Sequence, residues 1–283
     1  MKLELRRFNP SSLPDDATCV VCAKRNSGKS VLIKDLLSYH KSIPFSVVIS
    51  PTESSNNFYS NFIPKMLIHD DYKTELVENF LDRQKKLTSK KKREIKQFGS
   101  SSIDNRALLI MDDCMYQAKE FVSSKEIREI FMNGRHIAVN FYLTMQFPLG
   151  IPPALRCNVD YVFLLKDNIK KNKERLYEHW AGVIPTYQLF EQIFDQVTEN
   201  YGVMVIDNRS CSNKIEDCVF WYKADVNKEF RMCDEELWQL QAVQDMKDMH
   251  DPSNDDEAIE DNFNPNVLVK NNKNSVKINV KKV

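Results

Sequence analysis

No stretch of the 283-residue sequence approaches the run of about 18 apolar residues that a membrane-spanning helix requires. The first seven residues are rich in charged side chains and lack the apolar core of a signal peptide. These two absences lead us to expect a soluble protein that has no membrane span and works inside the cell.

An excess of charge of either sign is also missing, because 40 Lys and Arg residues balance 40 Asp and Glu residues. A protein with this balance can bind nucleic acid only through a local patch or through the inner surface of an assembly. With 42% hydrophobic residues, the chain is long enough for one large core and additional segments.

The sequence has little that would hold a structural zinc ion. Cys19 and Cys22 form a C-x-x-C, but no second such pair and no pair of histidines exists to complete a site. Both lie in an apolar segment that reads as a strand, where residues three apart point to opposite faces. We therefore expect core cysteines in a reducing compartment.

Hydrophobic segments that read as strands alternate with segments of helical periodicity. Near-continuous apolar strands that alternate with helices indicate a mainly parallel sheet with helices on both faces, which is an α/β fold. The expected strands cover residues 17–22, 45–49, 107–111, 137–143, 159–165 and 202–206, and the expected helices include 29–39, 125–132, 171–180 and 187–198.

A phosphate-binding loop follows the first expected strand. Residues 23–30 have the spacing of the Walker A motif, G-x-x-x-x-G-K-[ST], with Ala23 in place of the first glycine. In such a loop, backbone N–H groups and the start of a helix bind phosphates. We expect Lys29 to reach the β- and γ-phosphates of ATP, Ser30 to bind Mg²⁺, and Gly28 to let the backbone approach the phosphates. The residues expected to bind the nucleotide are Ala23, Lys24, Arg25, Asn26, Ser27, Gly28, Lys29 and Ser30.

Two carboxylates follow the expected strand at 107–111. Asp112 and Asp113 come directly after its apolar residues, and open α/β sheets place their ligand sites at the carboxyl ends of strands. We expect Asp112 to be the Mg²⁺ partner, through water, and Asp113 to orient or deprotonate the attacking water. The second carboxylate is typical of ATPases with an additional strand beside the phosphate-loop strand. A guanine-reading N-K-x-D is missing, since residues 213–216 read N-K-I-E, so GTP is disfavoured.

Polar and cationic residues near other strand ends could complete the site. Gln146, and after it Thr144, follow the expected strand at 137–143 and are the candidates for sensing the γ-phosphate. Ring ATPases commonly use an arginine of the neighbouring subunit to stabilise the transferring phosphoryl group. Arg135 and Arg156 each precede an expected strand and are the candidates, with Arg135 preferred because its loop leads into the sensor strand. Either arginine could instead be an ordinary ion-pair partner on the surface.

Two stretches depart from the alternating pattern. Between residues 83 and 96, eight cationic residues stand against one acid, which indicates either a path for DNA phosphates or a solvated insertion. From about residue 251 the chain is rich in Asn, Asp and Lys and is expected to be disordered. We expect an N-terminal extension at 1–16, an ATPase domain at 17–230 with a basic insertion at about 83–100, a C-terminal helix at 231–250 and a tail at 251–283.

Longer strings go beyond what a generic P-loop protein needs, and they lie at residues 23–37, 49–53, 109–114, 131–136, 144–156, 158–163, 177–182 and 220–224. They resemble the genome-packaging ATPases of large nucleocytoplasmic DNA viruses, of the poxvirus, iridovirus and giant-virus type, in the FtsK–HerA superfamily. The resemblance covers roughly residues 17–230. Carried over by position, it makes Lys29 and Ser30 the Walker A residues, Asp112 and Asp113 the acidic pair, and Gln146 the sensor.

The resemblance also implies an architecture and partners. It implies a RecA-like core of the additional-strand, catalytic-acid type and a homo-oligomeric ring at a capsid vertex, in contact with vertex components. The activity it implies is ATP- and Mg²⁺-dependent translocation of double-stranded DNA without sequence preference. The implied location is the host cytoplasm, the viral factory or the virion.

Three other functions remain open at this stage. A related DNA translocase or helicase acting in replication or segregation would share the same catalytic residues. A P-loop switch protein, whose nucleotide only stabilises an assembly, would have little use for Asp113 and Gln146. A small-molecule kinase would need a lid with several phosphate-binding arginines, and no such segment is evident.

Overall fold

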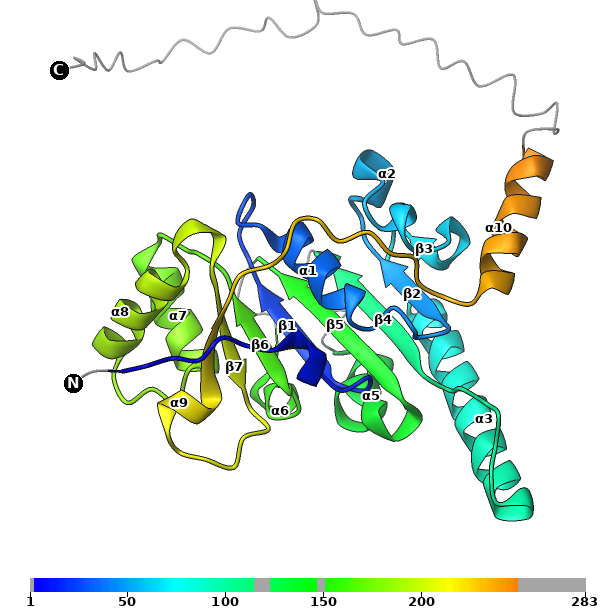
Figure 1. The fold of residues 1–283 in the computed structure, drawn as a ribbon, viewed down its shortest axis with the longest axis horizontal. Coiled ribbons are helices and arrows are strands. Elements are labelled where there is room, and N and C mark those ends of the chain that lie inside the picture. Colours follow the sequence, from blue (N-terminus) through cyan, green and yellow to red (C-terminus); the bar gives the residue numbers. More distant parts are fainter. Residues whose placement is uncertain (1–2, 115–122, 147–150, 249–283) are drawn as a thin grey trace, which may run out of the picture. The chain divides into compact units, whose positions relative to one another are not determined.

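The computed structural model describes residues 3–114, 123–146 and 151–248 (Figure 1). In these ranges, eight strands form one sheet in the order β3-β2-β4-β5-β1-β6-β7-β8. The strands are β1 (Thr18–Cys22), β2 (Ser46–Ile49), β3 (Ile68–His69), β4 (Ala107–Asp112), β5 (Val139–Met145), β6 (Tyr161–Leu164), β7 (Val203–Asp207) and β8 (Val219–Tyr222). The helices are α1 (Lys29–Ser38), α2 (Glu53–Asn56), α3 (Thr74–Phe98), α5 (Lys125–Asn133), α6 (Pro153–Arg156), α7 (Lys170–Trp180), α8 (Tyr187–Val197), α9 (Ile215–Cys218) and α10 (Glu235–Asp248). Single 3₁₀ turns are η1 (Pro10–Ser12), η2 (Tyr59–Asn61), η3 (Lys65–Leu67), η5 (Gly134–Ile137) and η7 (Glu199–Tyr201).

The chain divides into two units. Met1–Gln241 contains the sheet, and Ala242–Val283 begins within α10. The C-terminal helix expected at 231–250 corresponds to α10, whereas the tail expected at 251–283 lies outside the described residues. None of the helices in the described ranges is both long and apolar enough to span a membrane.

The sheet is parallel except at one edge. The strands β3, β2, β4, β5, β1 and β6 pair in parallel, while β7 pairs antiparallel with both β6 and β8. The predicted mainly parallel α/β fold is confirmed. Because β5 lies between β4 and β1, the carboxyl ends of three adjacent strands, which carry the predicted catalytic segments, meet at one edge of the sheet.

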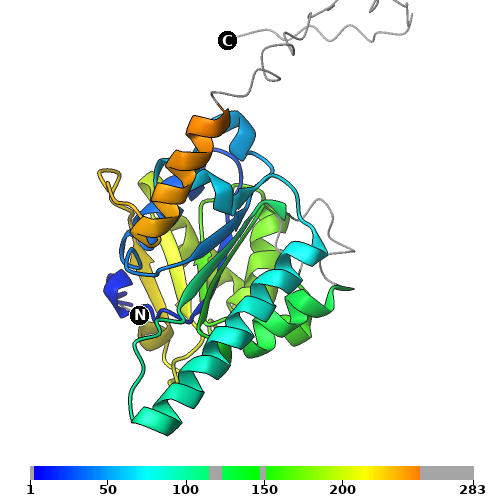
Figure 2. The same ribbon diagram turned by 90° about the vertical axis from the view of Figure 1, so that its right-hand side faces the viewer.

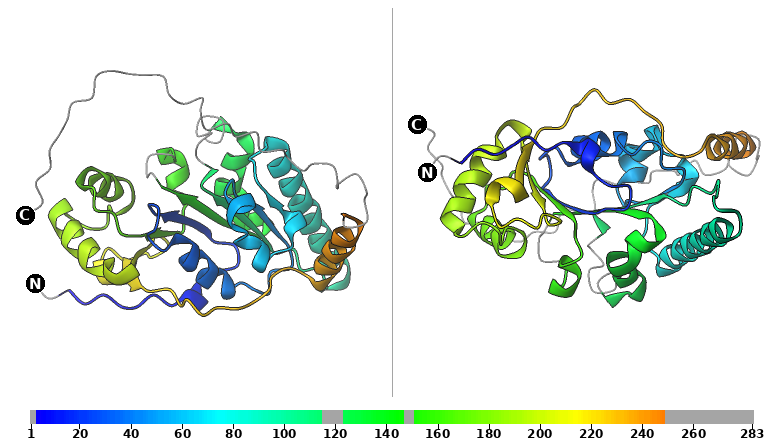
Figure 3. Two further views of the ribbon diagram at one scale, coloured as in Figure 1. Left: turned by 90° about the horizontal axis from the view of Figure 1, so that it is seen from above. Right: turned by 60° about the horizontal axis from the view of Figure 1, so that its bottom comes forward.

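Apolar side chains cover both faces of the sheet. Helix α1 packs on one face, while α3, α5, α7 and α8 pack on the other (Figure 3). The central strands are buried on both faces, and their sequences are correspondingly apolar throughout rather than alternating. Cys19 and Cys22 are both buried and belong to cores on opposite faces, as the three-residue spacing predicts.

The strand expected at 137–143 begins two residues later than its apolar pattern suggests. Residues Gly134–Ile137 form the 3₁₀ turn η5, and Ala138 adopts a left-handed conformation before β5 starts. The shift carries β5 through Met145. As a result, Thr144 is a buried strand residue, and Gln146 is the first residue beyond the strand.

The basic stretch at 83–96 is the second half of the 25-residue helix α3. A buried stripe at helical spacing holds α3 to the sheet, and Gln84 within it donates hydrogen bonds to the carbonyls of Asn105 and Ile137. The stripe ends at Thr88, and the rest of α3 continues past the sheet (Figure 2). The expected basic insertion is therefore an ordered helical projection.

The turn between α8 and β7 is tightly built. The Thr198 hydroxyl donates to the Phe194 carbonyl, and the Gly202 N–H donates to the Glu199 carbonyl at 2.8 Å. A Cβ atom added to Gly202 would lie 2.0 Å from the carbonyl oxygen of Val197, which is part of the backbone and cannot move aside freely. Two non-glycine residues of this turn, Asn200 and Tyr201, have positive φ angles.

We predict that Gly202→Ala lowers the free energy of unfolding by about 1–3 kcal/mol, because the added methyl group overpacks the turn. Gly182→Ala is the matched control, since a Cβ there meets no atom within 4 Å; this exposed change should stay within about 0.5 kcal/mol. Urea unfolding of both variants measures the difference. Equal stability of the two variants would refute the tight packing of this turn.

Candidate functional site

The phosphate loop connects β1 to α1 in the predicted geometry. The Ala23 N–H donates to the Met145 carbonyl at 2.9 Å, which fixes the start of the loop against β5. The Ser27 hydroxyl donates to the Lys24 carbonyl at 2.6 Å and closes the loop. Gly28, at the N-terminus of α1, has φ +94°, a conformation that favours glycine. The loop therefore presents its backbone and the start of α1 to one cavity.

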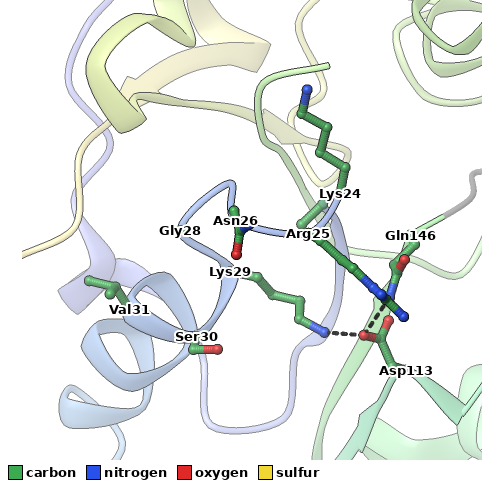
Figure 4. A pocket seen from close by; sticks show the side chains of 10 residues that line it. Lys24, Arg25, Asn26, Gly28, Lys29, Ser30, Val31, Asp113 and Gln146 are labelled. Atoms are coloured by element: carbon green, nitrogen blue, oxygen red, sulfur yellow. Dashed lines mark hydrogen bonds and ion pairs between the residues drawn. The ribbon is translucent and has the colours of Figure 1, made fainter. Parts of the chain in front are cut away.

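The side chain of Lys29 crosses from α1 to the end of β4. Its Nζ donates to Asp112 Oδ1 at 2.7 Å and to Asp113 Oδ2 at 2.6 Å (Figure 4 shows the contact with Asp113). Burial lowers the pKa of Lys29, but the charges of Asp112 and Asp113 and their hydrogen bonds outweigh it and raise the pKa. The ammonium group thus stays protonated between two carboxylates, as the convergence of the two motifs requires.

Thr144 holds this group of charges together. Its side chain is completely buried, and its hydroxyl donates to Asp112 while accepting from the backbone N–H of Asp113 at 3.1 Å. Lys29 Nζ lies 3.4 Å from the same hydroxyl oxygen. Thr144 therefore orients both carboxylates from behind. A threonine at a strand end gave no signal for this role in the sequence beyond its proximity to Gln146.

Asp113 is presented to the cavity by an uncommon backbone conformation. Its φ is +56°, in the left-handed region that non-glycine residues seldom adopt. The Gln146 amide donates to Asp113 Oδ2 at 2.9 Å (Figure 4). Such conformations persist where surrounding contacts over-determine them, and they cluster at functional sites. Gln146 thus lies beside the predicted base, where its predicted sensor role requires it.

A second layer of polar residues lies behind Asp112. The buried carboxylate of Glu53 accepts hydrogen bonds from the backbone N–H groups of Phe58, Tyr59 and Ser60 at 2.8–3.1 Å. This turn places the Tyr59 side chain near Asp112: burial raises the pKa of Tyr59, and the charge of Asp112 and its interaction with the phenol raise that pKa further. The phenol therefore stays protonated beside this carboxylate. Sequence reasoning missed this contact because Tyr59 belongs to no motif.

A cavity of about 190 Å³ joins the loop to the catalytic edge. Asp113, Gln146 and the loop face each other across it (Figure 4). Arg25 is exposed and extends towards Asp113 and Gln146 (Figure 4). The lining residues are Ala23, Lys24, Arg25, Asn26, Gly28, Lys29, Ser30, Val31, Asp113 and Gln146.

The donor set fits a magnesium ion that is shared with a nucleotide. Ser30 lines the cavity, Asp112 contacts the Lys29 side chain that also lines it, and Mg²⁺ prefers such oxygen ligands. Among the described residues, no group of three or more His, Cys, Asp or Glu side chains could hold a metal ion without help. Mg²⁺ typically keeps several waters and binds through one or two protein groups plus phosphate oxygens, which this arrangement allows.

The two candidate arginines lie at the amino-terminal ends of the strands, opposite the end of the sheet that carries the phosphate loop. Arg135 precedes β5, and its guanidinium lies 3.4 Å from Asp160, whose carboxylate also accepts from the N–H of Thr18 at the start of β1. The five residues of β1 rise about 3.3 Å each and so separate this edge from the loop by roughly 15 Å. Arg156, in α6, contacts His179 at 2.5 Å. Neither reaches the site of its own chain, so either could act only in a neighbouring subunit.

Comparison with known proteins places these motifs in a viral family. No protein-family model matches the chain. The chain is 44% identical over 223 residues to uncharacterized protein L437 of Acanthamoeba polyphaga mimivirus, which covers 79% of this chain and 78% of that protein. It is 35% identical over 230 residues to uncharacterized protein 088R of Invertebrate iridescent virus 3, covering 79% and 83%. Uncharacterized protein 015R of Frog virus 3 is 36% identical over 232 residues, covering 81% and 69%.

The fold has a viral counterpart among solved structures. The genome packaging NTPase B204 of Sulfolobus turreted icosahedral virus 2, solved with AMP, matches with a TM-score of 0.51 and 16% identity over 75% of this chain and all of that one. At this identity the likeness shows the fold, and it confirms the predicted P-loop NTPase architecture. The predicted resemblance to proteins of giant viruses and iridoviruses is confirmed by the sequence relatives. The chain belongs to the family of large-DNA-virus proteins that includes mimivirus L437 and iridescent virus 088R.

Proposed function

We propose that the protein is an ATPase that uses Mg²⁺ and drives double-stranded DNA into a viral capsid. The observation that carries the ATPase activity is the convergence of Lys29 with Asp112 and Asp113, at 2.7 and 2.6 Å. These groups come from a phosphate loop and from the end of a strand two positions away in the sheet. Their arrangement matches the needs of phosphoryl transfer, in which catalysis consists mostly of positioning and electrostatic stabilisation.

In the proposed cycle, each residue has a separate task. The Lys29 ammonium exchanges the two carboxylates for β- and γ-phosphate oxygens, so ATP takes the place of an internal ion pair. Asp113, freed from Lys29, accepts the proton of the attacking water, and Gln146 beside it orients that water. Thr144 keeps Asp112 and Asp113 in place during the exchange. Ser30 and Asp112 would hold a Mg²⁺ ion, which would neutralise charge on the phosphate oxygens.

The DNA-packaging role rests on further support. The fold is shared with a protein named as a genome packaging NTPase, and the sequence relatives come from large DNA viruses. Arg135 and Arg156 lie on the side of the sheet away from the phosphate loop. A homo-oligomeric ring would bring one of these arginines from one subunit to the site of the next. A DNA translocase acting in replication or segregation is the second candidate, because it would use the same residues on an intact or opened duplex.

The second half of α3 offers a surface for DNA phosphates. Lys86, Lys90 and Arg93 recur at helical spacing, are exposed, and form no ion pair within the described ranges. Two other cations of the stretch are already engaged: Lys85 with Glu129, and Lys91 with Asn105. Contacts from such side chains to phosphates would carry no sequence preference. The uncommitted face, rather than the whole basic stretch, is the proposed DNA contact.

Asp113→Asn should bind ATP with nearly unchanged affinity and hydrolyse it about 10²–10⁴-fold more slowly, because the general base is lost while its shape is kept. Steady-state phosphate release and equilibrium ATP binding measure the two effects. Glu78→Gln, which neutralises an exposed carboxylate of α3, is the control for the loss of one charge. Normal turnover by Asp113→Asn would show that another group is the base.

Mixed oligomers test the arginines. Lys29→Ala subunits alone should be inactive because they lack the lysine that binds the phosphates. Arg135→Ala subunits alone should be inactive because a missing arginine finger costs roughly 10³–10⁵ in rate. Mixing them creates interfaces at which an intact Lys29 faces an intact Arg135, so ATPase activity should partly return. Arg156→Ala is tested in the same way. Recovery with Arg156→Ala but not with Arg135→Ala would reassign the finger, and no recovery in either mixture would rule out action across an interface.

Replacing Lys86, Lys90 and Arg93 by Gln should weaken duplex DNA binding and flatten its salt dependence. Each lost phosphate contact reduces the slope of log K against log salt by about 0.9. The control replaces three exposed lysines elsewhere, Lys125, Lys170 and Lys171, and should leave the slope unchanged. An unchanged slope in the α3 variant would remove this helix from the DNA path.

A further inference from the structure

A second, apolar cavity of about 350 Å³ adjoins the phosphate loop. Its inner wall is formed by buried aliphatic side chains, and its rim by Tyr201 and by the segment after β8. A volume in this range suits a small-molecule site. The lining residues are Gly28, Val31, Leu32, Leu165, Tyr201, Val203, Lys223, Ala224 and Val226.

Tyr201 is held beside the loop by the α8–β7 turn. Its side chain is 69% exposed, and its φ of +62° is unusual for an aromatic residue. A Cβ atom on Gly28 would lie 3.3 Å from Tyr201 Cδ1, so the ring lies directly against the loop glycine. The turn that presents it leaves no room at Gly202 for a side chain. An exposed aromatic side chain on a residue with an uncommon backbone conformation, in a tightly packed turn, indicates a functional contact.

The order of residues along the loop decides which part of a nucleotide would reach this cavity. Asp113 and Gln146 mark the end where the γ-phosphate reacts, and Lys29 spans from there to α1. The first turn of α1 continues through Val31, which lines both cavities. A triphosphate running along the loop from Asp113 therefore brings its sugar and base past Val31, into the apolar cavity.

A third cavity, which Tyr201 also lines, suits a base less well. It is lined by Lys24, Lys166 and Glu199, among other polar residues, and includes no residue of α1. A base that stacks there would displace water from these charged groups, which is costly where its ring atoms do not replace that water.

We propose that the apolar cavity receives the nucleobase and that Tyr201 is the platform on which the base stacks. This assignment rests on the proposed ATPase function. The lining offers aliphatic walls, one aromatic ring and the Lys223 ammonium group, which only donates hydrogen bonds. Within the part of the chain that the structure describes, no carboxylate or amide side chain lines the cavity to accept from the N–H groups of guanine. Affinity for the base therefore comes from stacking and burial, and discrimination between purines is weak.

Removing the ring should affect nucleotides but not bare phosphates. In the full-length protein with Mg²⁺ and without DNA, Tyr201→Ala and Tyr201→Asn should bind ATP about tenfold more weakly, which corresponds to about 1.4 kcal/mol. Their affinity for inorganic tripolyphosphate should not change. Asn tolerates positive φ, so the second variant removes the ring without added strain. Tyr201→Phe should bind ATP as the unchanged protein does.

Phe98→Ala is the matched control, because Phe98 is also 69% exposed and ends the projecting helix α3; it should leave both affinities unchanged. Unaltered ATP binding by Tyr201→Ala, or an equal loss for ATP and tripolyphosphate, would overturn the assignment. Failure of the unchanged protein to bind either ligand would instead contradict the proposed ATPase function.

The choice of base provides a second readout. A site that reads a base through hydrogen bonds rejects analogues by about 10⁴–10⁵, whereas stacking should give ATP and GTP affinities within about tenfold of each other. A preference of 10³ or more for either purine would overturn the stacking-based assignment.

Discussion

The ion pair between Lys29 and the two carboxylates at the end of β4 is the interaction on which the site depends. It gives a mostly buried ammonium group two partners of opposite charge, and it ties the first turn of α1 to the end of β4. Burial of three unpaired charges would be costly, whereas phosphate oxygens can take over the role of the carboxylates towards Lys29. The arrangement that pairs these three charges is therefore also the one that a triphosphate would use.

The sheet topology makes this pair possible. Because β5 lies between β4 and β1, the Lys29 side chain reaches across the end of β5 to the carboxylates that follow β4. The side chain at the end of β5 therefore lies next to both Lys29 and these carboxylates. Thr144 occupies that position and hydrogen-bonds with Asp112, with the backbone of Asp113 and with Lys29. Tyr59 and the Glu53 turn complete the support from the β2 side. On the β7 side, the α8–β7 turn places Tyr201 beside Gly28 of the phosphate loop. The loop is therefore in contact with ordered segments on both sides.

The sequence predicted those features whose residues lie close together along the chain. The buried strands, the loop at 23–30 and the carboxylates Asp112 and Asp113 each carry a pattern within a few residues, and the structure brings them together as expected. Thr144 was a candidate only as a sensor, and the support that Thr144, Tyr59 and Tyr201 provide was not predictable, because it depends on which strands and turns become neighbours. The helical continuity of α3 was hidden for another reason. Its buried stripe includes Gln84 and Thr88, polar residues that hydrogen-bond with carbonyls and side chains of neighbouring segments.

A structure determined with Mg²⁺ and a non-hydrolysable ATP analogue tests the central claim most directly. The account predicts that Lys29 Nζ leaves Asp113 and contacts the β- and γ-phosphates, with the metal between those phosphates, Ser30 and Asp112. A nucleotide bound elsewhere, or one bound at the loop while Lys29 keeps both carboxylates, would contradict it.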